Sequence, residues 1–437
     1  MTLFRGTLLD TPVDPFAGGE LRTEADGALR VDATGTITQR GSWENVRTAY
    51  PDDDVVDLSG GLVLPGLVDT HVHYPQVRMI GALGMPLLEW LERSALPEEA
   101  RLADTAYAEA VARDFVNGLV SAGTTTALVF GSHFAGAVDA LFTEADRVGL
   151  RVTSGLVVSD RSLREDLLTT PQRAHDEGLA LARRWHGLRR NRYAVIPRFS
   201  LSCTEAMLAS CEALMGDVDG AWFTTHLNEN ALEVETVRQL FDDAGHYLHT
   251  YAEHRLVGSR SVFAHNVHAT HPELVDLAAA GSSVAHCPTS NAALGSVLFP
   301  LRTHLEHGVR VALGSDVGAG TGFSLLKEGL QAYFMQQLLG ASGLPLGPAH
   351  LLHLATAAGA AALGLGDQVG HLSVGYQLDA IWLRPSPGST LDVALRHARS
   401  PEDALAKAFA LGTPADVAGT WVAGAELAPS VDSPLQR

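Results

Sequence analysis

The chain has 437 residues, 46% of them hydrophobic, which suffices for one barrel-sized enzyme domain with an appended piece. Its 31 basic and 50 acidic residues give a net charge of -19, which excludes long-range attraction to nucleic acid or to an anionic membrane. No apolar run reaches the roughly 18 residues of a membrane span, and the opening MTLFRGTLLDTP predicts no signal peptide.

The N-terminal residues 1–64 contain short apolar runs separated by turns, which predict a small β-unit. From Gly61 onward, strand-like runs alternate with longer helical segments. Eight such runs lie between positions 61 and 320: LVLPGLVDTHVH, TTTALVF, RVTSGLVV, YAVIPRFSLS, AWFTTHLNE, SVFAHNV, SVAHCPTS and VRVALGSDVG. Eight parallel βα units close into a barrel, so the pattern predicts a (β/α)8 TIM-type fold of the α/β class.

Strand character returns near the C-terminus. After the helical stretch 351–365, which is rich in alanine and leucine, the segment GHLSVGYQLDAIWLRP and a strand from Ala418 to Ala423 follow. We expect these segments to pair with the N-terminal unit. The predicted domains are therefore a barrel over 65–370 and a small β-domain built from 1–64 and 371–437.

The first predicted barrel strand ends in Asp-Thr-His-Val-His, which places His71 and His73 two residues apart. Residues i and i+2 of a strand point to the same face, so both imidazoles can reach one ion in the barrel mouth. His226, His265 and Asp316 stand at the ends of predicted strands five, six and eight. The carboxyl ends of barrel strands converge on one side, where such enzymes carry their chemistry.

Histidine nitrogen and carboxylate oxygen, with no cysteine, are the donors of a catalytic zinc site, with iron as the second choice. The alternative is a set of hydrogen-bonded core residues, which the placement of five candidates at strand ends disfavours. The three cysteines, Cys203, Cys211 and Cys287, show no CxxC spacing. They predict neither a disulfide framework nor a structural zinc site, and they fit a reducing compartment, most simply the cytoplasm.

These motifs resemble the amidohydrolase superfamily, whose signature is HxH on strand one, His on strands five and six, and Asp on strand eight. Some members bridge two metals with a carboxylated lysine on strand four, where this chain carries Arg198. The only lysines are Lys327 and Lys407. The resemblance therefore implies one metal ion per chain, with His265 beside the metal-bound water. The ligands that it implies are His71, His73, His226 and Asp316.

Glu229 lies three residues after His226, on the turn that leaves strand five. Bound zinc lowers the pKa of water from 15.7 to about 7, and a carboxylic acid nearby could protonate a ring nitrogen while hydroxide attacks the adjacent carbon. The alternative is a solvated carboxylate at a helix start. HxxE is the spacing of single-metal superfamily members that deaminate aromatic rings. That likeness implies that Asp316 passes the water proton to the leaving amine, while His265 orients the hydroxide.

Further segments resemble the guanine deaminase branch of that superfamily. They are HYPQ (73–76), PLLEWL (86–91), PRFSLSC (197–203), HCPTSN (286–291) and GSDVGAG (314–320), and the likeness covers most of residues 61–365. It implies hydrolysis of a purine, best guanine, and a homodimer. Gln76 offers a donor and an acceptor to a purine edge, and Arg198 can donate to a carbonyl such as O6. The other candidate substrate-binding residues are Phe199, which can pack on the ring face, Trp90 and Leu88.

Several alternatives stay open from the sequence. A related deaminase or dechlorinase acting on adenosine-like compounds, 8-oxoguanine or a triazine would keep the metal set and differ in the pocket. A metal-free scaffold and a cyclic-imide hydrolase are disfavoured, by the complete ligand set and by the missing lysine. The glycine-rich stretch 318–322 lacks the Lys-Ser/Thr of a phosphate loop. His268 and His286 receive no role.

Overall fold

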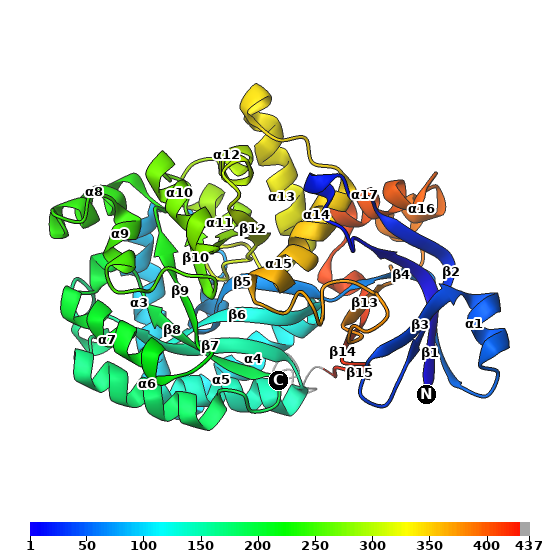
Figure 1. The fold of residues 1–437 in the computed structure, drawn as a ribbon, viewed down its shortest axis with the longest axis horizontal. Coiled ribbons are helices and arrows are strands. Elements are labelled where there is room, and N and C mark those ends of the chain that lie inside the picture. The colour runs from blue at the N-terminus through cyan, green and yellow to red at the C-terminus, as the bar shows by residue number, and fades with distance from the viewer. Residues whose placement is uncertain (429–437) are drawn as a thin grey trace.

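Two sheets contain the named strands of residues 1–428, the part of the chain that the computed structural model describes (Figure 1). The larger sheet has eight parallel strands in chain order, which confirms the predicted barrel. They are β5 (Leu67–His73), β6 (Thr124–Ser132), β7 (Arg151–Val158), β8 (Asn191–Pro197), β9 (Trp222–Leu227), β10 (Ser261–His265), β11 (Ser283–His286) and β12 (Arg310–Leu313). Nearly all of their residues are buried, as in sheets that helices cover from outside.

The barrel closes between its first strand and the segment that follows its last strand. The amide of Asp316 donates to the carbonyl of His71 over 2.8 Å, and the amide of His73 donates to the carbonyl of Val317 over 2.8 Å. The sequence placed Asp316 at the end of the eighth strand, but it lies three residues beyond β12. These two bonds hold its backbone directly against the His-x-His segment.

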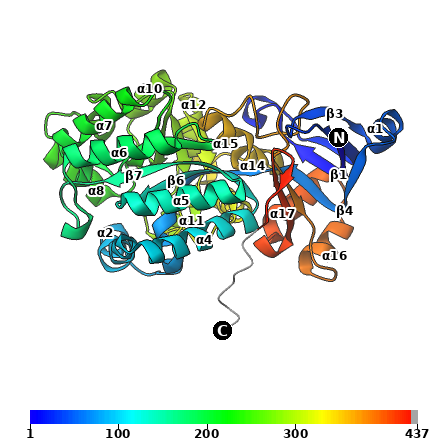
Figure 2. The same ribbon diagram turned by 90° about the horizontal axis from the view of Figure 1, so that it is seen from below.

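Helices and helical turns cover the barrel, and Figure 2 shows α5 and α6 along its outer side. The connection from β5 to β6 contains α2 (Leu87–Trp90), a π-helical turn (Leu91–Ala95), α3 (Leu96–Ala100) and α4 (Thr105–Ser121). The other helices are α5 (Ala135–Val148), α6 (Pro171–Trp185), α7 (Glu205–Asp217), α8 (Ala231–Leu240), α9 (Tyr247–Ala252), α10 (His271–Ala280), α11 (Pro288–Ala293), α12 (Leu301–Glu306), α13 (Leu325–Leu338), α14 (Pro348–Ala355) and α15 (Ala357–Ala362).

Helix α4 illustrates why these segments are helical. The carboxylate of Asp104 accepts a hydrogen bond from the amide of Tyr107 and so caps the first turn. Buried residues then recur at helical spacing, including Ala108, Val111 and Phe115, and this face packs towards the barrel core.

The smaller sheet joins the two ends of the chain, as predicted. Its order is β15-β14-β13-β4-β1-β2-β3, and β13 pairs antiparallel with β4. The strands are β1 (Thr2–Asp10), β2 (Arg22–Val31), β3 (Ile37–Ser42), β4 (Asp54–Pro65), β13 (Ala380–Leu383), β14 (Val417–Val422) and β15 (Ala425–Glu426). Helices α1 (Trp43–Ala49), α16 (Thr390–Arg396) and α17 (Pro401–Leu411) complete this end of the molecule (Figure 2). The last part of the predicted 371–437 segment, residues 429–437, lies outside the described residues.

Barrel and small sheet meet at a junction of one residue. Gly66 alone separates β4 from β5, and a Cβ there would lie 2.2 Å from Oγ1 of Thr125, so the chain passes too close for any side chain. The Arg151 guanidinium, at the start of β7, makes a buried ion pair of 2.7 Å with Asp379, which precedes β13. The three cysteines are free and buried, and within residues 1–428 no helix is long and apolar enough to span a membrane.

Candidate metal centre and cavity

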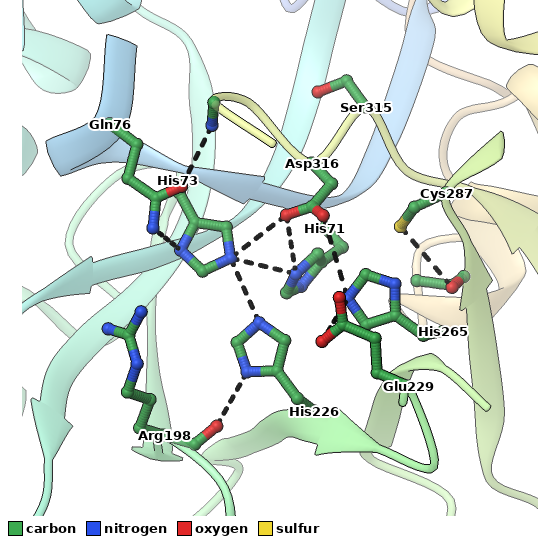
Figure 3. Close-up of polar contacts among 12 residues, drawn as sticks. His71, His73, Gln76, Arg198, His226, Glu229, His265, Cys287, Ser315 and Asp316 are labelled. Atoms are coloured by element: carbon green, nitrogen blue, oxygen red, sulfur yellow. Dashed lines mark hydrogen bonds and ion pairs between the residues drawn. The ribbon is translucent and has the colours of Figure 1, made fainter. Parts of the chain in front are cut away.

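Four buried side chains meet at the carboxyl end of the barrel (Figure 3). Nε2 of His73 lies 3.1 Å from Nε2 of His71, 3.2 Å from Nε2 of His226 and 3.2 Å from Oδ1 of Asp316. Oδ1 of Asp316 is 3.3 Å from Nε2 of His71. The structure therefore brings together the four side chains that the sequence singled out as ligands.

These distances fit donors around one cation. In a tetrahedral site with bonds of about 2.0 Å to nitrogen, donor atoms lie about 3.3 Å apart. A neutral His73 carries at most one proton on Nε2, which cannot serve three neighbours at once. Burial lowers the pKa of His73 to about 4 and the pKa of His226 well below its ordinary value, so both rings are neutral and able to ligate.

The backbone just after strand β8 orients the His226 ring. Its Nδ1 donates to the carbonyl of Arg198 over 2.7 Å, which leaves the lone pair on Nε2 facing the cluster. Burial acts to raise the pKa of Asp316, but hydrogen bonds from His71 and His73 outweigh it, and the carboxyl pKa lies well below its usual range. Three neutral nitrogens and one carboxylate are a donor set suited to a divalent metal.

His265 stands beside this cluster. Its Nδ1 lies 3.0 Å from Oδ1 of Asn291 and donates to it, which directs Nε2 towards the carboxylates of Glu229, at 3.5 Å, and Asp316, at 3.8 Å. That Nε2 atom is buried and has no hydrogen-bond partner among the described residues. A buried, unsatisfied nitrogen facing the cluster is placed to contact a small ligand there.

The backbone is strained where the site residues leave their strands. Asn228, His265, Asn266 and Asp316 have φ between 48° and 68°, a region that costs non-glycine residues about 1–3 kcal/mol each. A chain of side-chain hydrogen bonds supports these turns. Nδ2 of Asn228 donates to Oδ1 of Asn266 over 3.0 Å, and Nδ2 of Asn266 donates to Nε2 of His304 over 3.1 Å.

Glu229 is buried, with 3% of its surface exposed. Its amide donates over 3.0 Å to the carboxylate of Glu233, which forms the capping box of helix α8 together with Asn230. Burial, followed by the neighbouring Asp316 and Glu233 carboxyls, raises the pKa of Glu229 well above its ordinary value. The shift favours the protonated form of the side chain, which suits a proton donor.

The cluster opens into a cavity that combines polar and apolar walls. Gln76, Trp90, Arg198 and Phe199 line it, as the sequence predicted, whereas Leu88 does not. Leu88 is half-buried and packs against the core. Leu87 and Leu91, on the same helical segment, line the cavity instead. The complete lining is His73, Gln76, Leu87, Trp90, Leu91, Arg198, Phe199, His226, Glu229, His265, Leu294, Asp316 and Ala319.

Two residues behind this wall escaped the sequence analysis. Asn291 accepts from His265, and Glu99 accepts from both Gln76 and Arg198. Asn291 lies within the HCPTSN segment, which drew attention only as a resemblance. Glu99 is one of several glutamates between 89 and 99, and no pattern in the sequence separates it from the others, which are exposed or half-buried.

The two histidines without a predicted role lie away from the cluster. The His286 ring stacks on Phe299 with centroids 4.3 Å apart, and burial lowers its pKa to about 3. His268 lines a separate cavity together with residues of α8 and α9. Neither side chain lines the cavity that contains the metal cluster.

Comparison with known proteins places this site in a family context. Residues 62–427 match the Amidohydrolase family. A protein of Deinococcus radiodurans named probable guanine deaminase is 61% identical over 429 residues, covering 97% of this chain and 98% of the relative.

Solved structures of guanine deaminases also match this chain over nearly its full length. The E. coli guanine deaminase matches with a TM-score of 0.94 and 36% identity, covering 98% of this chain and 100% of the other. A guanine deaminase of C. acetobutylicum, solved with guanine bound in its active site, matches with a TM-score of 0.90 and 25% identity, over 98% and 99% of the two chains.

Proposed function

The chain belongs to the amidohydrolase family, and we propose that it hydrolyses guanine to xanthine and ammonia. The observation that carries this proposal is near full-length similarity, at 61% and 36% identity, to relatives named as guanine deaminases. The cavity supports it independently, because His73, His226 and Asp316 of the metal-ligand cluster, the Glu229 carboxyl with its raised pKa, and Arg198 all line it.

The ligands in this proposal are His71, His73, His226 and Asp316, and the ion is zinc, with Fe²⁺ as the second choice. When bound, such an ion lowers the pKa of a coordinated water from 15.7 to about 7 and so supplies hydroxide at neutral pH. Arg198 occupies the position that follows β8, and no lysine precedes Lys327. One ion per chain follows.

The remaining chemistry falls to the side chains around the cluster. Glu229 gives its proton to N3 of the purine while the attacking oxygen bonds to C2. Asp316 accepts the second proton of the water and returns it to the amino group, which leaves C2 as ammonia. The first proton of the water goes to Glu229 and replaces the one that Glu229 gives to N3. His265 orients the attacking oxygen from its unsatisfied Nε2. One water is consumed, and xanthine and ammonia are formed.

Recognition of guanine requires donors for its carbonyl and partners for its polar edge. Arg198 lines the cavity and gives one of its five donors to Glu99, which leaves others for O6 of the base. The amide of Gln76 is held by Gly318 and Glu99, and its Nε2 also lies 3.3 Å from Nδ1 of His73, so its Oε1 keeps one lone pair for the polar edge of the base. Phe199 and Trp90 supply apolar walls. Adenine would present an amino group to the donors of Arg198 and is disfavoured.

Asn291 positions His265 in this scheme, so Asn291→Ala is expected to lower kcat by about 10- to 100-fold while the metal stays bound. The reason is that Nδ1 of His265 loses its acceptor at 3.0 Å, and the ring can then rotate or change tautomer. Steady-state kinetics and metal content measured on the same preparation check this expectation. Unchanged kcat would remove Asn291 from the positioning of His265.

Product analysis tests the proposed function. Zinc-loaded protein incubated with guanine is expected to release one ammonia for each xanthine formed. Release of ammonia from S-adenosylhomocysteine or ammeline, with none from guanine, would instead favour a related deaminase or dechlorinase.

The cytoplasmic location and the homodimer expected from the sequence stay predictions.

A further inference from the structure

A buried carboxylate behind the cavity joins the two polar residues of its wall. Glu99 accepts from Nε2 of Gln76 over 2.7 Å through Oε1, and from Nη1 of Arg198 over 2.6 Å through Oε2. His133, which follows β6, places Nε2 3.5 Å from the same oxygen. The side chains of Glu99, Arg198 and His133 are each only 3% exposed. Glu99 itself is not part of the cavity lining.

The buried ion pair of Glu99 and Arg198 is poorly explained as a contribution to stability. Removing two charges from water costs several kcal/mol per ion, and a buried ion pair often stabilises a fold no better than apolar residues of similar volume. Burial acts to raise the pKa of Glu99, but Arg198 and then His133 outweigh it, so the pKa lies below its usual range and the carboxyl is ionised. Arg198 thus faces the cavity with its positive charge already balanced.

Because Glu99 balances the charge of Arg198, the cavity wall formed by Gln76 and Arg198 carries no net charge, and this affects which ligands it can bind. A neutral wall that donates hydrogen bonds suits a neutral carbonyl and gains nothing extra from an anion. An unbalanced guanidinium would attract any purine that has lost a ring proton. Xanthine ionises more readily than guanine, so such a wall would hold the product more tightly than the substrate. Glu99 also fixes which end of the Gln76 amide donates, because Oε1 of Gln76 accepts from the amide of Gly318 over 3.1 Å.

We propose that Glu99 is a specificity-determining positioning residue, which holds Gln76 and Arg198 together and neutralises Arg198 so that the cavity prefers a neutral lactam purine over an anionic one. The inference rests on the proposed function and deepens it, since it concerns how the wall discriminates guanine from its product. It acts through Gln76 and Arg198 and requires no contact between Glu99 and the substrate.

The test compares two purines that the enzyme does not convert. Hypoxanthine lacks the amino group and stays neutral, whereas xanthine becomes anionic at mildly alkaline pH. In Glu99→Gln the ratio of the inhibition constants of xanthine and hypoxanthine at that pH is expected to fall at least about tenfold. The KM for guanine should rise about 10- to 100-fold, with a smaller change in kcat.

Matched variants separate charge from structure. Glu98→Gln removes the adjacent carboxylate, which contacts Tyr107 and Arg101 outside the cavity, and should keep the wild-type ratio. Glu99→Asp retains the charge, so its ratio should stay near that of the wild type even where KM rises. If Glu99→Gln does not fold, Arg198→Gln should raise the ratio, and the double variant Glu99→Gln/Arg198→Gln should bring it back.

The inference is wrong if Glu99→Gln and Glu98→Gln share the wild-type ratio, or if the double variant fails to reverse the effect of Arg198→Gln. Turnover of guanine by the wild-type enzyme is measured first in every series. If guanine is not deaminated at all, the proposed function fails. If it is deaminated and the ratios do not move, only the role of Glu99 fails.

Discussion

Glu229→Gln is expected to lower kcat for guanine deamination by about 10²- to 10⁴-fold and to leave the bound metal at its wild-type level. The amide has the shape of the carboxyl group but holds no acidic proton for N3 of the purine. Glu229 is not one of the four donors around the cluster, so the metal should remain. Steady-state kinetics combined with elemental analysis of the same sample measures both quantities.

Glu235→Gln is the matched control for this variant. Glu235 lies on the same helix, α8, where its exposed carboxylate pairs with Arg238 on the surface, and its loss should leave kcat unchanged. Full activity of Glu229→Gln would remove this residue from the mechanism. Loss of the metal together with activity would mean instead that Glu229 supports the cluster.

His226→Ala is expected to abolish stable metal binding and to reduce kcat/KM by about 10³-fold or more. Nε2 of His226 lies 3.2 Å from Nε2 of His73, and its loss leaves three donors where four converge. Elemental analysis after dialysis, followed by activity assays with and without added zinc, measures the effect. A chelator applied to the wild-type enzyme should cause the same loss, which added zinc should reverse.

The control for this second variant is His249→Ala. His249 lies on α9, where its half-exposed ring pairs with Glu253, and it is not among the residues that line the cavity. It should keep both metal and activity, which excludes a general effect of removing imidazole. An His226→Ala enzyme that retains one metal per chain and full activity would contradict the proposed ligand set.

The sequence predicted the barrel because a strict alternation leaves few choices. Eight buried strand-like runs separated by helical segments commonly close into a (β/α)8 barrel. The i, i+2 spacing of His71 and His73 puts both rings on one face of the first strand. The pairing of both chain ends was predictable because each carries strand character that a barrel does not use. Asp316 was placed at the end of a strand, yet it lies three residues beyond β12 in a left-handed conformation.

The remaining cavity residues could not be predicted, because their positions depend on the path of long connections between the strands. The segment 74–123 between β5 and β6 contains a π-helical turn, and its course decides that Leu87 and Leu91 line the cavity while Leu88 packs elsewhere. Glu99 belongs to the same connection. Its partner Arg198 is 99 positions away, so only the folded path brings the two charges together. A run of similar glutamates carries no local sign of which one is buried.

The central claim is tested most directly by measuring kcat/KM for guanine and adenine side by side on the zinc-loaded enzyme. In the proposed binding mode Arg198 donates to a carbonyl where adenine has an amino group, so guanine should be preferred by at least about 10³-fold. Equal turnover of the two bases, or turnover of adenine alone, would contradict the account.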